Sequence, residues 1–126
     1  MAFDAVVQTI SVPAAADLTG LEMRFMTIGA SGQMNKTGAG LMADGVLEHA
    51  AGAAGRSGSL AIHGAPKMIA GAAIAAGALV ASDANGKPVT AVSGDQILGK
   101  TLMAASAAGD VIPVLLKLGA AEATKP

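Results

Sequence analysis

The sequence predicts an all-β domain, a small barrel or sandwich built from two similar halves with an extended N-terminal arm. Three observations predict this class. A long uncharged run, from Met68 to Ser82, leads into a turn. The chain matches itself when it is displaced by 54 residues. Glycines recur between short β-prone segments at the spacing of turns, which is typical of small all-β folds.

Neither a membrane span nor a helix fits the uncharged run. A membrane-spanning helix needs about 20 apolar residues, and Lys67 and Asp83 end the run after fifteen. Alanine favours a helix, but Gly71 and Gly77 lie within the run, and each costs about 1 kcal/mol relative to alanine in a helix. We therefore expect strands here.

The residues after the run predict a β-hairpin. Asn85 and Gly86 form a favoured pair for a two-residue type I′ turn, in which both central residues take positive φ. Strand-forming residues flank the pair on both sides. We expect strands over 78–82 and 87–92.

The repeat relates residues 25–62 to residues 79–116 without a gap. Alanine matches carry little weight in an alanine-rich chain, whereas aligned glycines mark positions where the absence of Cβ matters. We expect turns at these glycines. The aligned pairs are Gly32 with Gly86, Gly40 with Gly94, Gly45 with Gly99, and Gly55 with Gly109.

Each copy predicts the same succession of strands and glycine turns. A first strand and a short returning strand are followed by two further strands. Pro113 lies in the last of these and indicates an edge strand or a bulge. The three longer strands of the two copies are Met23–Ile28 and Ala78–Ser82, Gly45–His49 and Gly99–Ala104, and Ser59–His63 and Val111–Leu116.

The repeat also divides the chain. Residues 1–20 lie outside it and predict an N-terminal arm, residues 21–118 the β-domain, and residues 119–126 a flexible tail. Within the arm, Ala5–Val12 could form a strand with Val6, Ile10 and Val12 on one face. The N-terminus lacks a basic and a long apolar region, so we expect no secretory signal.

The composition restricts the partners and the chemistry. Apolar residues make up 52% of the chain, but many are alanine, and the aromatic residues are Phe3 and Phe25. Such a core buries little area, which suggests that neighbouring subunits complete its stability. The net charge is −1 with no basic patch, so we expect no nucleic-acid partner. Cysteine is absent, which excludes disulfides and a thiol nucleophile.

Several motifs suggest chemistry, but each has a simpler explanation. GDQILGKT, at 94–101, matches a phosphate-binding P-loop. Its counterpart in the other copy, 40–47, keeps both glycines without Lys-Thr, and Asp95 places a negative charge where phosphate would bind. His49 and His63 lack metal-site spacing, and no serine stands in a nucleophile elbow. We expect no enzyme, cofactor or metal.

Four segments in succession resemble the small capsid decoration, or cement, proteins of tailed bacteriophages. They are DLTGLEMRFMTIGASGQ (17–33), ADGVLEHAAGAAGRSGSLAIHG (43–64), PKMIAGAAIAAGALVASDANGKPV (66–89) and GDQILGKTLMAASAAGDVIPVLL (94–116). The resemblance covers about residues 17–118. It implies a β-clip-like fold similar to that of the lambdoid head decoration protein, with no catalytic residues, no cofactor and no membrane partner.

The resemblance also implies a place and a partner. Such proteins are made in the host cytoplasm and bind the outer surface of the expanded head, often as trimers, where they bridge neighbouring major capsid protein subunits. As a hypothesis, the arm adds a strand to an exposed sheet edge of the capsid. Its predicted contact residues are Ala5, Val6, Val7, Ile10 and Val12.

Three other functions remain open from the sequence. A nucleotide-binding protein would need the P-loop match to be real. A fibre-type or carbohydrate-binding virion module would share the small β-fold, although aromatic platforms for sugars are scarce. A cellular β-clip binding module would share the fold without the virion.

Overall fold

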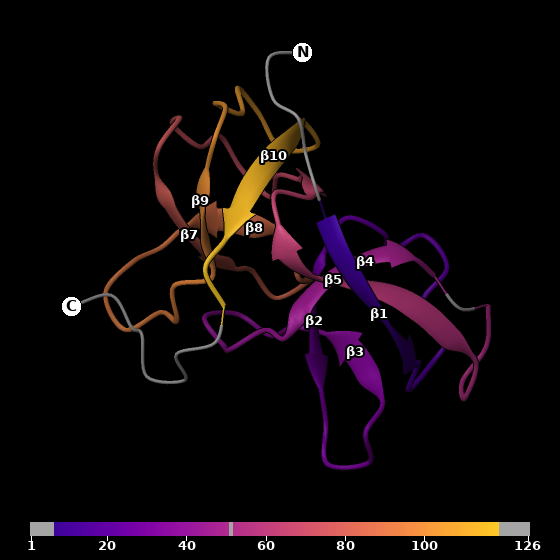
Figure 1. Cartoon of the computed structure of the whole chain (residues 1–126). Coiled ribbons are helices and arrows are strands. Elements are labelled where there is room, and N and C mark those ends of the chain that lie inside the picture. The colour runs from indigo at the N-terminus through magenta and orange to yellow at the C-terminus, as the bar shows by residue number, and fades with distance from the viewer. Residues whose placement is uncertain (1–6, 51, 119–126) are drawn as a thin grey trace.

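The computed structural model describes residues 7–50 and 52–118, which form ten strands in two five-stranded antiparallel sheets (Figure 1). The all-β prediction is confirmed, and none of the described residues lies in an α-helix. No helix long and apolar enough to cross a membrane occurs in this part of the chain. The first sheet contains β1 (Val7–Pro13), β2 (Phe25–Ile28), β3 (Met34–Lys36), β4 (Gly45–His49) and β5 (Ser57–Gly64). The second contains β6 (Lys67–Ile69), β7 (Leu79–Ser82), β8 (Pro88–Thr90), β9 (Gly99–Thr101) and β10 (Val111–Leu116).

The two sheets have the same topology. Their strand orders are β1-β5-β4-β2-β3 and β6-β10-β9-β7-β8, so each strand of the first sheet has a counterpart five places later. The predicted architecture of two similar halves is confirmed. The sheets stay open, so the structure corresponds to a small sandwich or clip and not to a closed barrel.

Hydrogen bonds outside the strands also recur between the halves. They show that the loops, and not only the strands, follow one plan. The matching bonds are Met23 N to Leu47 O and Gly77 N to Thr101 O (2.8 and 2.9 Å), and Ala14 N to Arg56 O and Ala70 N to Asp110 O (both 2.8 Å).

The predicted β7–β8 hairpin is present, but its turn is not type I′. Gly86 takes a positive φ of 81°, whereas Asn85 does not take a positive φ. Gly86 N donates to Asp83 O (3.2 Å) and Asp83 N donates to Lys87 O (2.8 Å), which closes a three-residue loop with a left-handed glycine. The Asp83 carboxylate accepts hydrogen bonds from Asn85 N and Lys87 N, and these favour the longer loop.

The structure differs from the predicted N-terminal arm. From Val7 on, the chain is strand β1, which pairs antiparallel with β5 along its whole length. Val12 is 4% exposed, and Ala14 and Leu18 beyond the strand are fully buried. These apolar side chains pack into the first half and hold the segment on the body. Ala5, Val6 and the predicted tail at 119–126 lie outside the described residues.

The first sheet is buried on both of its faces. On β2, β4 and β5, alternate side chains point to opposite sides. Residues of one face, Met26, Leu47 and Leu60, belong to a core cluster confined to the first half. Residues of the other face, Phe25, Val46 and Ala61, belong to a cluster shared with the second half. The shared cluster therefore joins the two halves.

The second sheet is buried on one face. Ile112 and Val114 of β10 lie in the shared cluster, while Val111 and Leu115 of the same strand are 48% and 37% exposed. Pro113, predicted at an edge or a bulge, instead lies in this interior strand. It stands where the pairing of β10 changes from β6, through residues 111–113, to β9, through residues 114–116.

Candidate functional site

The aligned glycines serve two different purposes. Six of them take positive φ in loops: Gly32, Gly40, Gly55, Gly86, Gly94 and Gly109. Gly45 and Gly99, predicted as turns, instead begin strands β4 and β9. A Cβ at Gly99 would lie 2.7 Å from Leu115 O, and one at Gly45 would meet Ala61 O in the same way. Close approach of neighbouring strands explains glycine at these two positions.

The tip of the β7–β8 hairpin docks on the first half. Phe25 N donates to Gly86 O at 2.7 Å, and a Cβ at Gly86 would lie 2.7 Å from Phe25 O. Lys36 Nζ donates to Asn85 Oδ1 at 3.4 Å. Backbone thus meets backbone without an intervening side chain, which makes the joint between the halves stiff.

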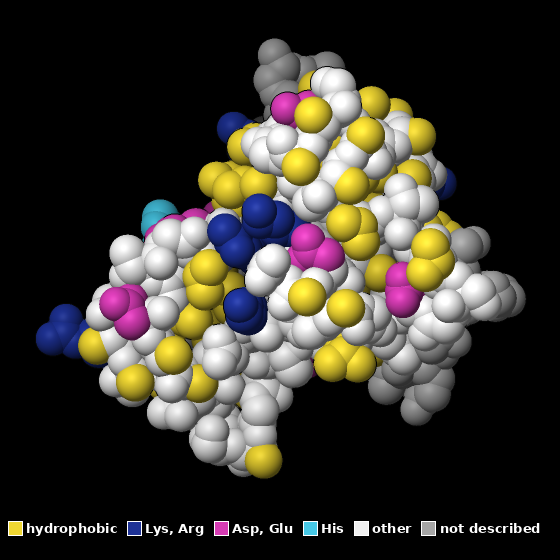
Figure 2. Space-filling view, turned by 180° about the vertical axis from the view of Figure 1, so that it is seen from behind, with side chains coloured by type: hydrophobic (Ala, Val, Ile, Leu, Met, Phe, Trp, Pro, Cys, Tyr) yellow, Lys and Arg dark blue, Asp and Glu magenta, His cyan; other side chains and the backbone are white. Residues whose placement is uncertain are grey.

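Two equivalent loops meet beside this joint. In the β3–β4 loop, Gly40 N donates to Ser82 O (2.9 Å), and Gln96 N of the β8–β9 loop donates to Gly40 O (3.0 Å). Leu41 and Val92, one from each loop, are the two most exposed large apolar side chains among the described residues. Around the joint, Figure 2 shows Lys and Arg side chains gathered in the middle of the back face, with apolar side chains on either side.

The four sheet edges differ in their protection. Strands β3, β6 and β8 are each three residues long, and each carries a lysine or a proline, which discourages pairing with another chain. Strand β1 has seven residues and no charged side chain. Gln8–Ser11 are exposed, and Ile10 among them is 42% exposed. The edge of β1 is therefore the long unprotected edge of the described structure.

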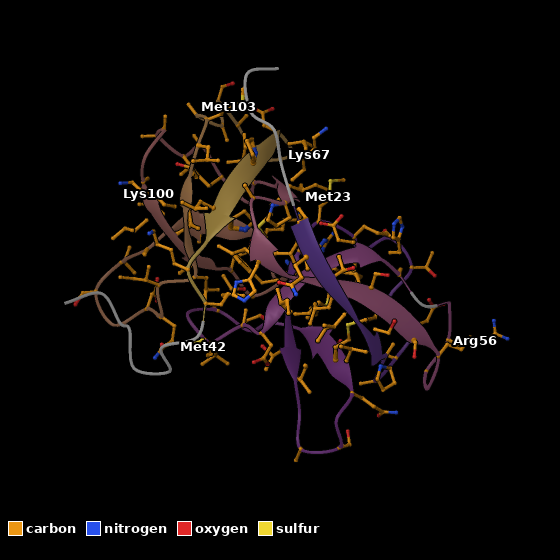
Figure 3. The ribbon with its side chains drawn as sticks, viewed as in Figure 1. Met23, Met42, Arg56, Lys67, Lys100 and Met103 are labelled. Carbon is orange, nitrogen blue, oxygen red and sulfur yellow. The ribbon has the colours of Figure 1, made fainter. Side chains whose placement is uncertain are left out.

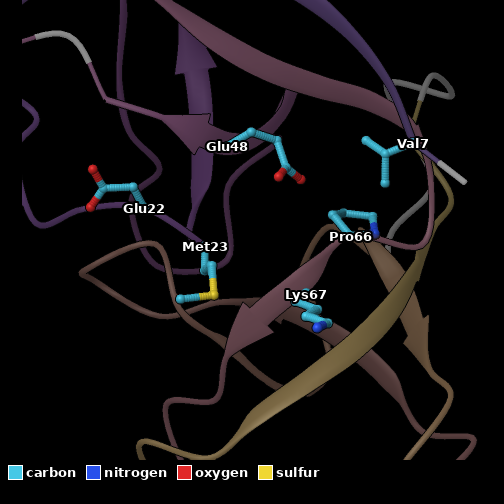
Figure 4. Close-up of a pocket in the computed structure, with 6 residues that line it drawn as sticks. All are labelled: Val7, Glu22, Met23, Glu48, Pro66 and Lys67. Carbon is cyan, nitrogen blue, oxygen red and sulfur yellow. The ribbon is translucent and has the colours of Figure 1, made fainter. Parts of the chain in front are cut away.

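A cleft of about 340 Å³ lies between the halves at the beginning of β1 (Figure 4). Its lining combines two carboxylates and one ammonium with apolar side chains: Val7, Glu22, Met23, Glu48, Pro66 and Lys67. Met23 takes a positive φ of 64°, which is uncommon for a residue with a side chain. Sequence reasoning missed this position, although the repeat aligns it with Gly77, whose φ is 73°.

Comparison with known proteins identifies the family. The model of the phage cement protein family matches residues 5–116, most of the chain. The chain belongs to the phage cement protein family. This confirms the resemblance found in the sequence. No curated protein matches the chain.

A solved structure has a similar fold. The head fiber gp8.5 N base of bacteriophage phi29 superposes with a TM-score of 0.70 at 14% identity. The match covers 89% of this chain and 95% of that one. At this identity the likeness supports the fold of the cement protein and nothing more specific.

The P-loop match does not form a phosphate-binding loop in this cement protein. Gly99–Thr101 is strand β9, and no helix follows it. The Thr101 hydroxyl donates to Ala75 O (2.7 Å) and accepts from Ala78 N (3.1 Å). Lys100 points outward from the second sheet (Figure 3). The Lys-Thr pair thus serves the sheet, with one side chain in solvent and the other in backbone hydrogen bonds.

The two histidines are not brought together. His49 at the end of β4 and His63 in β5 are both exposed. Within residues 7–50 and 52–118, no group of three or more His, Cys, Asp or Glu side chains could hold a metal ion.

One carboxylate stabilises the loop before β10 and leads to a prediction of pH dependence. Hydrogen bonds from Ser106 N, the Ser106 hydroxyl and Ala107 N lower the pKa of Asp110 below its ordinary value. A lowered pKa in the folded state adds stability above the ordinary pKa, and this is lost as the pH falls through the folded value. Asp110→Asn should therefore unfold at a lower urea concentration than wild type at pH 7, and the gap should close near pH 2.

The control for this prediction is Glu22→Gln, which also removes one negative charge. We expect its urea midpoint at pH 7 to stay near that of wild type. A gap for Asp110→Asn that persists unchanged into strong acid would contradict the role of its ionised carboxylate.

Proposed function

We propose that this cement protein binds the outer surface of the expanded phage head and stabilises it by bridging neighbouring major capsid protein subunits. It acts as a homo-oligomer, with a trimer favoured, and joins the virion after synthesis in the host cytoplasm. The family match over residues 5–116 carries this proposal. The stiff joint between two small sheets supports it, because a clamp between capsid subunits needs rigidity and surface.

The capsid contact proposed here is the free edge of β1. The predicted arm included Val7 and Val12, but Val12 is buried and Val7 is half-buried, so neither side chain is free to bind. Ile10 stays exposed, between the exposed polar residues Thr9 and Ser11. An uncharged edge with free backbone groups is suited to pairing with an extended segment of the capsid protein.

Repetition would make such a contact effective. A bridging molecule that releases one capsid subunit remains held by the other, so rebinding becomes intramolecular at a high effective concentration. A modest edge contact, repeated over the lattice, can then stabilise the whole head.

Binding to heads tests the function, and Ile10→Lys tests the contact. Purified protein is incubated with expanded, undecorated heads and sedimented with them. Wild type should co-sediment in saturable amounts and raise the temperature at which the heads break open. Because a charge on an edge strand opposes pairing, Ile10→Lys should bind at least tenfold more weakly.

Val92→Lys is the control, since Val92 is 62% exposed and lies in a loop of the second half. It should bind heads as wild type does. Failure of wild type to co-sediment would refute the function, whereas equal binding by wild type and Ile10→Lys would refute only the edge contact.

A fibre-type module is the second candidate, favoured by the similar fold of the phi29 head fiber base. Such a module would also attach to heads, so the same experiment covers it. A carbohydrate-binding module has less support, because Phe25, the aromatic residue in the described range, is fully buried and cannot stack on a sugar.

A further inference from the structure

The two halves carry hairpin tips of the same geometry. In the β2–β3 tip, Gly29 N donates to Gln33 O and Gly32 N donates to Gly29 O, both at 3.0 Å. The β7–β8 tip, 54 residues later, has the equivalent two bonds described above. Gly32 and Gly86 take φ of 77° and 81°. The two tips therefore present the same backbone shape.

Their surroundings are different. The β7–β8 tip is docked, with Gly86 buried against the backbone of Phe25. The β2–β3 tip projects from the body, at the bottom of the view in Figure 1. Gly32 is exposed, and a Cβ on it would meet nothing within 4 Å. One copy of this docking element is thus used within the chain, and the other is free.

The receiving surface is also present twice. In the first half, Phe25, Val46 and Ala61 form the face that is buried with the second half. Their counterparts 54 residues later, on β7, β9 and β10, stay accessible to solvent: Leu79, Lys100 and Leu115.

The backbone at this face is free as well. Thr37 N donates to Phe25 O, and Ala91 N donates to Leu79 O in the same way, both at 3.0 Å. Phe25 N donates to Gly86 O, but Leu79 N has no backbone acceptor among the described residues outside its strand pairing. The amide that receives the tip in the first half thus has an unoccupied counterpart in the second.

We infer that the β2–β3 tip of one copy docks on the outer face of the second sheet of another copy. The contact repeats, between chains, the joint that the chain makes between its halves, with Gly32 O accepting from Leu79 N of the neighbour. A second copy is the occupant because this chain itself supplies the free tip that matches the free face. The inference rests on the self-association in the proposed function.

Such a contact joins two different surfaces, so the assembly is head-to-tail. Heterologous contacts of this kind close into a ring or continue as a filament. Each copy then gives one tip and receives one, and the apolar side chains of Val111 and Leu115 become covered.

Sedimentation velocity of the purified full chain tests this inference. Gly32→Asn adds a side chain at the tip, and Asn tolerates positive φ better than other residues. Leu115→Glu places a charge on the receiving face. Both variants should sediment as monomers at concentrations where wild type is associated. The controls, Gly20→Asn at φ 83° with nothing within 4 Å and Val92→Glu in an exposed loop, should associate as wild type does.

Circular dichroism and the urea midpoint show whether each variant is folded. A wild-type protein that is monomeric at 100 µM, or folded tip and face variants that associate like their controls, would overturn the inference. Head binding is scored separately. Wild type that binds heads but shows no dependence on Gly32 or Leu115 refutes the docking, whereas loss of all head binding refutes the proposed function.

Discussion

Replacing Phe25 with alanine is expected to lower the free energy of unfolding by about 3–5 kcal/mol. Phe25 is among the largest fully buried side chains and belongs to the core cluster shared by the halves. An alanine-rich core has few neighbours large enough to fill the resulting cavity. Since a domain of this kind is stable by about 5–15 kcal/mol, the loss removes a large part of its stability.

Urea unfolding followed by circular dichroism measures this loss. The matched control is Leu41→Ala, which shortens an exposed side chain and should change the free energy by about 0.5 kcal/mol or less. A loss below about 1 kcal/mol for Phe25→Ala would contradict the shared core. A transition that splits in two would instead show that Phe25 is the main coupling between the halves.

The hairpins could be predicted from the sequence because their signals are local. Strand formers on either side of a glycine turn are sufficient to place β7 and β8. The type of turn was wrong because Asp83, two residues before Asn85, accepts backbone hydrogen bonds and favours a longer loop. Such a side-chain contribution is invisible to a rule based on the central pair.

The role of β1 could not be predicted in the same way. Its partner β5 lies about fifty residues later in the chain, and nothing within residues 1–20 encodes that pairing. The apolar alternation was recognised, yet the sequence alone does not show whether such a strand pairs at home or with another protein. The candidate contact surface consequently contained Ile10, which is exposed, together with Val12, which is core.

The repeat carried more information than the turn rules. It aligned Gly32 with Gly86 and Gly45 with Gly99, and each pair has one structural explanation in both halves. It also aligned Met23 with Gly77, a signal for the strained residue in the cleft. What it could not show is where the halves differ. One tip is docked and the other exposed, and only the three-dimensional arrangement reveals this difference.

Gly86→Ala is expected to lower the free energy of unfolding by about 3 kcal/mol. The positive φ of Gly86 alone costs a side chain about 1–2 kcal/mol. The new Cβ would also lie 2.7 Å from Phe25 O, a backbone atom that cannot rotate away. Relief of this clash moves the tip and lengthens the bond from Phe25 N to Gly86 O, which adds about 1–2 kcal/mol. Urea unfolding in dilute solution gives the value.

Gly32→Ala separates the two contributions, because the equivalent glycine has nearly the same φ and no neighbour within 4 Å. In a dilute, monomeric sample it should lose only the conformational term of about 1–2 kcal/mol. The difference between the two variants then measures how tightly one hairpin tip is held against the other half. Equal losses would mean that the joint yields easily, and a joint that yields could not serve as a rigid clamp between capsid subunits.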